Sequence, residues 1–219
     1  MPVLLRQFRV LRYDTRGHGG SSVTPGPYTN AQLADDVIRL LDSLEIERAH
    51  FCGLSMGGMA GMRLGVAAPE RIGRLVLCST GAKIGSAESW KARIDTVLQQ
   101  GMAAVTDSIL GRWFTAAFAA QNPEVIEPIR RMLVECSPEG YVACSEAIRD
   151  ADERDAISQI RARTLVISGR HDPATPPTDG HFLAERIPGA RYLELPGSHL
   201  SNIECSDEFN RAIMSFLQA

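Results

Sequence analysis

Short apolar runs alternate with amphipathic segments along most of the chain. The runs have the length and composition of buried strands, and we expect strands at 8–13, 49–54, 74–78, 164–168 and 191–195. Between them, apolar residues recur at helical spacing, which predicts helices at 30–44, 57–68, 178–187 and 206–217. Strands that alternate with helices in this way predict an α/β fold with a mostly parallel sheet.

The pattern changes between residues 86 and 161, where no strand-like run occurs. Helical stretches are expected instead at 90–100, 102–118, 125–135 and 140–150. An all-helical insertion between two strands is typical of a cap that lies over the carboxyl ends of the strands and shapes the pocket there. We therefore expect a helical cap at 86–161, inserted into a core formed by 1–85 and 162–219.

Composition and charge narrow the partners. The chain has 219 residues, of which 44% are apolar, and its net charge is −3. Without a basic excess, nucleic acid and anionic membrane surfaces are poor partners, so we expect a small-molecule substrate. No signal peptide and no apolar run of membrane-spanning length is apparent, which favours the cytoplasm.

Cysteine and histidine spacing gives no sign of a metal centre. The five cysteines are irregularly spaced, and we interpret them as buried thiols: Cys52, Cys78, Cys136, Cys144 and Cys205. The five histidines form no zinc-ligand pattern, and no glycine-rich phosphate or dinucleotide fingerprint follows a strand. We expect an enzyme without metal or cofactor.

A glycine-flanked serine stands where the expected strand at 49–54 meets the following helix. In Gly53-Leu54-Ser55-Met56-Gly57, a serine at a sharp strand-to-helix turn would have strained backbone angles and an exposed hydroxyl. The glycines leave room for strand and helix to approach each other. Read alone, the pattern also fits an ordinary glycine-rich turn; the flanking strand and helix favour a nucleophile elbow.

Two further residues follow expected strands and so belong to the same edge of the sheet as Ser55. Asp172 comes after 164–168, and His199 comes after 191–195. A serine hydroxyl needs a base to become nucleophilic, and the base needs a carboxylate to fix its tautomer. We predict a catalytic set of Ser55, His199 and Asp172, in the chain order of α/β hydrolases.

Other residues compete for these roles. The alternative acids are Asp150, Asp155 and Glu204, and the less suitable histidines are His50, His171 and His181. The turn after the first expected strand also contains Asp14 and His18. We interpret both as loop scaffolding, because the segment is rich in turn-forming residues and a proline-rich connection follows.

With these residues in place, the chain resembles the 3-oxoadipate enol-lactonases among the α/β hydrolases. The likeness extends from about residue 8 to 217 and is carried by motifs at 8–19, 50–58, 112–115, 171–177 and 199–204. It implies hydrolysis of 3-oxoadipate enol-lactone to 3-oxoadipate, a step in the bacterial breakdown of aromatic compounds. It also implies an oxyanion hole that uses the backbone N–H of Met56.

The substrate implied by this resemblance carries a free carboxylate, which needs a cation in the pocket. Arg112 is the candidate cation, with Trp113 as a wall of the pocket. The alternative is that Arg112 is a solvated cap residue and Trp113 belongs to the core of the cap.

The chain also departs from the family, whose members begin with further strands and a His-Gly type loop. We therefore expect a truncated gene product or a fragment, with half of the oxyanion hole missing and an unpaired strand edge beside Ser55. Low lactonase activity, restored by the upstream segment, is the corresponding expectation. The alternative functions are a broad esterase or perhydrolase, and a catalytically silent fragment or interaction module; the sequence does not indicate the oligomeric state.

Overall fold

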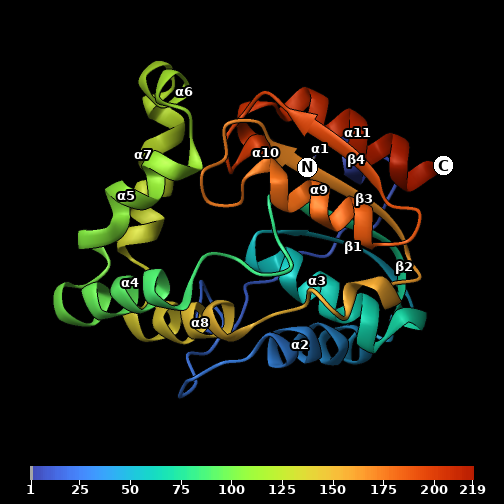
Figure 1. The fold of residues 1–219 in the computed structure, drawn as a ribbon, viewed down its shortest axis with the longest axis horizontal. Helices are drawn as coiled ribbons and strands as arrows, with labels where there is room; N and C mark the ends of the chain where they lie inside the picture. The colour runs from blue at the N-terminus through green and yellow to red at the C-terminus, as the bar shows by residue number, and fades with distance from the viewer. Residues whose placement is uncertain (1) are drawn as a thin grey trace.

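A parallel sheet of four strands forms the centre of the computed structural model, which describes residues 2–219 (Figure 1). The strands are β1 (Ala49–Leu54), β2 (Ile72–Cys78), β3 (Arg163–Gly169) and β4 (Arg191–Leu195), and they lie side by side in chain order. Leu54 pairs with Cys78, Cys78 with Ile167, and Gly169 with Leu195. This register brings the carboxyl ends of all four strands to one edge of the sheet.

Helices cover both faces of the sheet, as the alternating pattern predicts. On one face, α2 (Asn30–Ser43), α3 (Met56–Ala67) and α9 (Pro177–Arg186) enclose a core that includes Leu75 and Leu77 of β2. On the other face, α11 (Ser206–Gln218) packs against Val76 and Cys78 of the same strand. Alternate β2 side chains thus enter opposite cores, which explains why residues 75–78 of this strand are all apolar.

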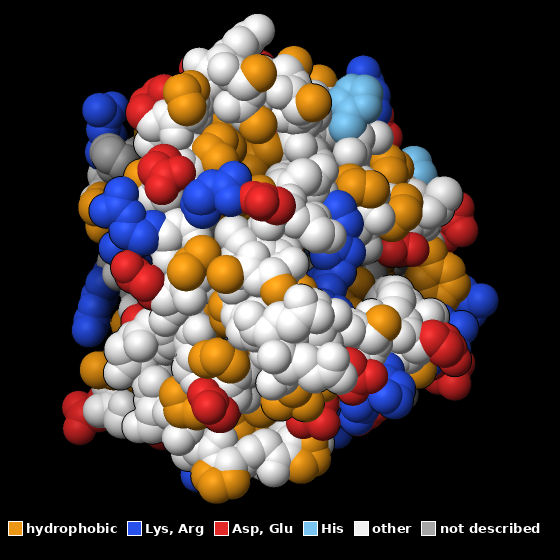
Figure 2. Space-filling model, turned by 90° about the vertical axis from the view of Figure 1, so that its left-hand side faces the viewer, with side chains coloured by type: hydrophobic (Ala, Val, Ile, Leu, Met, Phe, Trp, Pro, Cys, Tyr) orange, Lys and Arg blue, Asp and Glu red, His pale blue; other side chains and the backbone are white. Residues whose placement is uncertain are grey.

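Five helices form a segment between β2 and β3, here called the helical segment 87–150. They are α4 (Ala87–Gln100), α5 (Ala103–Trp113), α6 (Ala116–Gln121), α7 (Pro123–Val134) and α8 (Pro138–Asp150). Their own apolar core includes Val97, Ile109 and Phe114. Figure 1 shows α5, α6 and α7 to the left of the sheet, whereas α4 and α8 lie side by side at the lower left, with α8 near α2. Figure 2 shows the left-hand side of the view in Figure 1, where acidic and basic side chains are intermixed with apolar ones.

The segment 151–162 returns the chain to the sheet. It contains a short 3₁₀ helix, Ile157–Gln159, in which Ile157 is fully buried in the main core together with Ile160. A second 3₁₀ helix, Pro69–Arg71, connects α3 to β2. No helix within residues 2–219 combines the length and apolar character needed to cross a membrane.

The expected strand at 8–13 is wrong. These residues are irregular in structure, and no strand of the described chain pairs with them. A strand is defined by its ladder of backbone hydrogen bonds, so an apolar run without a neighbour does not form one. β1 is consequently an edge strand, in agreement with the unpaired edge expected beside Ser55.

Smaller differences concern short elements and two cysteines. Two four-residue helices, α1 (Pro2–Leu5) and α10 (Ser201–Glu204), were not expected, and the helix expected over 102–118 is divided between α5 and α6. The five cysteines are free, but Cys52 is exposed and Cys136 is half-buried, whereas all five were expected to be buried. The position of Cys52 on the edge strand β1 explains its exposure, whereas Cys78 on the interior strand β2 is fully buried.

Candidate active site

Ser55 lies between β1 and α3 in a strained backbone conformation. Its φ of 54° and ψ of −118° are unusual for a residue with a side chain. The surrounding backbone holds this geometry: the Ser55 N–H donates to the Cys78 carbonyl at 2.9 Å, and the Ser55 carbonyl accepts from the Thr80 hydroxyl at 2.7 Å. The turn is therefore attached to the end of β2 on both sides of the serine.

The glycines around Ser55 permit this close approach of strand and helix. A β-carbon on Gly53 would collide with the backbone of Gly57, and one on Gly58 would lie 2.6 Å from the side chain of Thr80. A β-carbon on Gly57 would meet nothing within 4 Å. The steric requirement thus falls on Gly53 and Gly58, while Gly57 contributes the backbone that Gly53 contacts.

Asp172 and His199 form a buried pair at the ends of β3 and β4. The Asp172 Oδ2 atom lies 2.8 Å from the His199 Nδ1 atom, and each residue is only 3% exposed. Because parallel strands end at the same edge, the loops after β3 and β4 converge here, as the sequence predicts.

Thr175, which was not among the residues predicted from the sequence, completes the surroundings of the Asp172 carboxylate. Its hydroxyl donates to Asp172 Oδ2 at 2.7 Å, and its backbone N–H and that of Ala174 donate to Oδ1 at 3.0 and 2.8 Å. Burial alone would raise the pKa of Asp172, but the hydrogen bond from His199, the charge of that ring and the bonds from Thr175 outweigh it, so the pKa is lowered. Asp172 is held as a carboxylate.

The His199 imidazole is oriented through one of its two nitrogens. Among the described residues, its hydrogen-bond partners, Asp172 at 2.8 Å and Thr175 at 3.3 Å, both face Nδ1. This contact assigns the proton to Nδ1 and leaves Nε2 as the basic atom. In residues 2–219, no hydrogen bond joins the His199 ring to the Ser55 hydroxyl. The hydrogen bond between a catalytic base and its nucleophile is often long before a substrate binds.

Met56 is the first residue of α3 and follows Ser55 directly. The first N–H groups of a helix have no carbonyl partner within the helix, and the helix dipole makes this end positive. A backbone donor is therefore present beside the Ser55 hydroxyl.

Trp113 and Arg112 lie at the end of α5, and Trp113 reaches the histidine. The indole ring stacks on His199 with 6.5 Å between ring centroids and 22° between planes. Arg112 is half-buried, and desolvation, with a smaller effect from Arg93, lowers the pKa of its guanidinium. Among the described residues it forms no ion pair with a carboxylate, and its Nε donates to the Ser108 carbonyl at 3.2 Å.

The alternative acids have other partners. Asp150 pairs with Arg149 at 2.7 Å, Asp155 is exposed on a loop, and Glu204 accepts from the Thr115 N–H at 2.6 Å. Two of the alternative histidines pack on other aromatic rings: the His181 ring packs on Tyr192, and the His50 ring meets Phe8 at the far end of β1. His171, the neighbour of Asp172 in the chain, is exposed.

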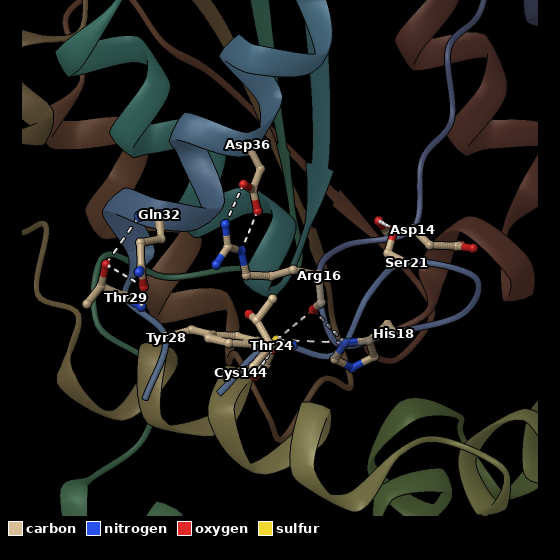
Figure 3. A network of polar contacts seen from close by, with 10 residues as sticks. All are labelled: Asp14, Arg16, His18, Ser21, Thr24, Tyr28, Thr29, Gln32, Asp36 and Cys144. Carbon is tan, nitrogen blue, oxygen red and sulfur yellow. Dashed lines mark hydrogen bonds and ion pairs between the residues drawn. The ribbon is translucent and has the colours of Figure 1, made fainter. Parts of the chain in front are cut away.

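The 14–21 loop is a scaffold, as expected (Figure 3). Asp14 accepts from the Gly20 N–H at 2.9 Å, and Arg16 forms a two-pronged ion pair with Asp36 of α2 at 2.5 and 2.6 Å. The His18 Nδ1 atom lies 3.7 Å from the Cys144 sulfur of α8. Burial raises the pKa of Cys144 to about 12, which keeps this thiol in its neutral form near neutral pH.

A cavity of about 400 Å³ opens beside the loops that contain Asp172 and His199. Its lining comes from the α5–α6 junction and from both loops: Gly111, Phe114, Thr115, Ala116, His171, Pro173 and Ser198. A larger cavity, of about 670 Å³, is lined by residues that precede β2, β3 and β4, including Pro69, Arg161 and Pro188. It therefore lies at the opposite edge of the sheet from Ser55.

The parallel sheet, the strained serine turn and the buried Asp172–His199 pair define an α/β hydrolase. The sequence pattern of the family described as "Alpha/beta hydrolase family" matches residues 2–212, so the chain belongs to that family and is a hydrolase.

Comparison with known proteins makes this class more specific. The chain is 42% identical over 212 residues to 3-oxoadipate enol-lactonase 2 of Acinetobacter baylyi (strain ATCC 33305 / BD413 / ADP1), which covers 97% of this chain and 79% of that protein. The crystal structure of the enol-lactonase from Burkholderia xenovorans LB400 superposes with a TM-score of 0.99 and 48% identity, covering 100% of this chain and 84% of that one. The chain is an enol-lactonase-like α/β hydrolase.

A third relative is an esterase. The thermophilic esterase from Thermogutta terrifontis, solved with malate bound, superposes with a TM-score of 0.92 at 30% identity and covers 98% of this chain and 81% of that one. The matches to the family pattern and to the two enol-lactonases confirm two predictions from the sequence motifs, the α/β hydrolase family and the likeness to enol-lactonases.

Proposed function

We propose that this enzyme hydrolyses 3-oxoadipate enol-lactone to 3-oxoadipate by covalent catalysis. Ser55 is the nucleophile, His199 is the base, and Asp172 is the carboxylate that orients the imidazole. The observation that carries the proposal is the buried Asp172–His199 pair, whose Oδ2 and Nδ1 atoms lie 2.8 Å apart, at the edge of the sheet where Ser55 follows β1. The names of the relatives above support the choice of substrate.

In the first half of the reaction, the His199 Nε2 atom takes the Ser55 hydroxyl proton while the serine oxygen attacks the lactone carbonyl carbon. The backbone N–H of Met56 stabilises the negative charge that develops on the carbonyl oxygen. The ring C–O bond then breaks, the leaving enolate takes up the proton that His199 holds, and the resulting enol tautomerises to the ketone, so His199 is neutral again. An enolate leaves more readily than an alkoxide, so this proton need not be transferred before the C–O bond breaks.

In the second half, water releases the acyl group from Ser55. His199 takes a proton from the water molecule, whose oxygen attacks the ester carbonyl, and the proton returns to the serine oxygen as the product leaves. The lowered pKa of Asp172 suits this role, because a carboxylate stabilises the imidazolium formed at each attack.

Arg112 and Trp113 are the proposed substrate-binding residues. A half-buried guanidinium without a carboxylate partner in the described chain suits the free carboxylate of the substrate. The Trp113 ring, stacked beside His199, would form a wall of the pocket next to the reacting atoms. In this proposal the helical segment 87–150 is the cap that selects the substrate.

The reaction needs no metal or cofactor in this scheme. The product is a small acid, which fits a step in the breakdown of aromatic compounds by a cytoplasmic enzyme.

The closing test is turnover of the enol-lactone by wild type and Ser55→Ala, with loss of lactone absorbance as readout. The substitution is expected to lower kcat by about 10⁴-fold or more; a variant that keeps wild-type kcat would contradict the proposal.

A broad esterase is the second candidate, favoured by the likeness to the Thermogutta terrifontis enzyme. The two candidates share the catalytic residues and differ in the pocket, so kcat/KM for the enol-lactone and for p-nitrophenyl acetate separates them. A preference for the lactone supports the first candidate, whereas equal values support the second.

A further inference from the structure

Glu204 lies where the loop that contains His199 meets the α5–α6 junction. It is the last residue of α10, five positions after His199, and it is half-buried. One carboxylate oxygen accepts from the Thr115 N–H at 2.6 Å, and the other accepts from the Ser198 N–H at 3.2 Å and the Thr115 hydroxyl at 3.3 Å. A single side chain thus bridges two segments that are far apart in the sequence.

Two further hydrogen bonds run parallel to this bridge. The Ser198 hydroxyl donates to the Arg112 carbonyl at 2.9 Å, and the Leu200 N–H donates to the Trp113 carbonyl at 3.0 Å. The residues on either side of His199 are therefore bonded to the two residues proposed to bind the substrate. The stacking of Trp113 on His199 lies between these bonds.

Local structure adapts to the carboxylate on both sides. The helical structure is interrupted between α5 and α6. Phe114 makes the last helical hydrogen bond of α5, so the N–H of the next residue, Thr115, can donate to Glu204. On the other side, a β-carbon on Gly197 would approach the Glu204 side chain at 3.2 Å, so the glycine lets the carboxylate lie close to the loop. Charged hydrogen bonds of this kind are the strong ones in proteins.

We propose that Glu204 is a positioning residue that fixes His199 relative to Ser55 and to the Arg112–Trp113 pair. The inference rests on the proposed function, because it requires His199 to be the base. Glu204 forms no hydrogen bond with the imidazole in the described chain, so it acts through Ser198 and Thr115 and not as an acid in the reaction.

The test compares Glu204→Gln and Glu204→Ala with wild type. The glutamine has the same shape, but its amide group can accept at only one of the two positions, whereas alanine removes both contacts. Glu208→Ala is the matched control: Glu208 is an exposed carboxylate one turn away, in the first turn of α11, and its ion-pair partner is Arg211 at 3.8 Å.

The main readout is the rate constant for labelling of Ser55 by a fluorophosphonate, in which the serine oxygen displaces fluoride from phosphorus. The second readout is steady-state hydrolysis of p-nitrophenyl acetate, which gives KM and a kcat expressed per labelled serine. Thermal unfolding of each variant is measured as well. Because small displacements of a catalytic group are costly, we expect Glu204→Ala to lower the labelling rate and kcat by about 10- to 100-fold while KM changes less than about 2-fold. Glu204→Gln should lie between, and Glu208→Ala should match wild type.

Two results would overturn the inference. One is a wild-type labelling rate in Glu204→Ala. The other is a reduced number of reactive serines with an unchanged rate for each, which would show that Glu204 serves folding alone. If the alanine variant yields no folded protein, the same two criteria apply to Glu204→Gln.

Ser55→Ala separates this inference from the proposed function. If Ser55→Ala is still labelled at the wild-type rate, the proposed function fails. If it is not labelled and the Glu204 variants react as wild type does, only the role of Glu204 fails. Thr115→Val combined with Glu204→Ala gives a further check, since residues acting through one bridge should not have additive effects.

Discussion

The Trp113 indole ring lies over the His199 imidazole, with their planes 22° apart and their centroids separated by 6.5 Å. Aromatic pairs in this range contribute about 0.5–1.5 kcal/mol beyond the area they bury. The contact joins the end of α5 to the loop after β4, so the helical segment 87–150 and the sheet meet at this histidine.

The first prediction follows from that contact. Trp113→Ala removes the ring and should lower kcat/KM for p-nitrophenyl acetate by about 2- to 12-fold, the equivalent of the stacking energy. Trp113→Phe keeps an aromatic face and should retain most of the activity. Steady-state kinetics at matched enzyme concentration checks both, and an alanine variant as active as the phenylalanine variant would show that the stacking has no part in catalysis.

The second prediction concerns the charge of Arg112. A charged hydrogen bond to the substrate carboxylate is worth about 1.5–3 kcal/mol, so Arg112→Ala should raise KM for the enol-lactone by about 10- to 150-fold. The neutral ester p-nitrophenyl acetate has no carboxylate to lose, and its KM should stay the same.

Arg93→Ala is the control for general charge effects, because Arg93 is a neighbouring cation that adds to the effect of burial in lowering the pKa of Arg112, and it packs on the Trp90 ring. Its KM for the lactone should match that of wild type. An unchanged lactone KM in Arg112→Ala would remove Arg112 from the substrate site.

The third prediction uses the lowered pKa of Asp172. A carboxyl group whose pKa is lower in the folded state stabilises that state fully above its unfolded pKa of about 3.9, and this contribution disappears as the pH falls through the folded-state pKa. The free energy of unfolding, measured by urea denaturation between about pH 2 and 6, should therefore decrease more steeply in acid for wild type than for Asp172→Asn. Parallel curves for the two proteins would contradict the lowered pKa.

The fourth prediction concerns stability away from the site. Asn30, at the start of α2, donates to the buried Glu153 carboxylate at 2.8 Å and to the Met59 carbonyl at 3.1 Å. Asn30→Ala leaves Glu153 without this donor and should lower the free energy of unfolding by about 1.5–3 kcal/mol. The double variant Asn30→Ala with Glu153→Ala should lose less than the sum of the single changes, whereas additive losses would show that the two side chains are not coupled.

The sequence predicted the parts of the fold that depend on local pattern. The strands 49–54 and 191–195 match β1 and β4, and the helix 30–44 matches α2. At the start of α2, Thr29 and Gln32 form a capping box. These elements have clear periodicity and clear ends. Ser55, Asp172 and His199 could be placed at one edge from the sequence because each lies in a segment that follows a strand, and parallel strands end at the same edge; their catalytic roles stay a prediction.

Long-range contacts account for what the sequence did not predict. The apolar run 8–13 has strand composition, but a strand requires a neighbour, which the run itself cannot reveal. The continuous helical pattern over 102–118 is broken at Thr115, whose backbone hydrogen bonds to Glu204, 89 positions away. Thr175 and Glu204 lie within motifs singled out from the sequence, but the hydrogen bonds of Thr175 to Asp172 and of Glu204 to Thr115 become apparent only in the folded chain.

In the proposed mechanism the Ser55 oxygen is the nucleophile, and the Asp172–His199 pair activates it. The direct measurement is peptide mapping by mass spectrometry after reaction with a fluorophosphonate, for wild type, Ser55→Ala and His199→Ala. We predict an adduct on Ser55 in wild type, none in Ser55→Ala, and a labelling rate at least about 100-fold lower in His199→Ala. An adduct on another residue, or labelling of Ser55→Ala at the wild-type rate, would contradict it.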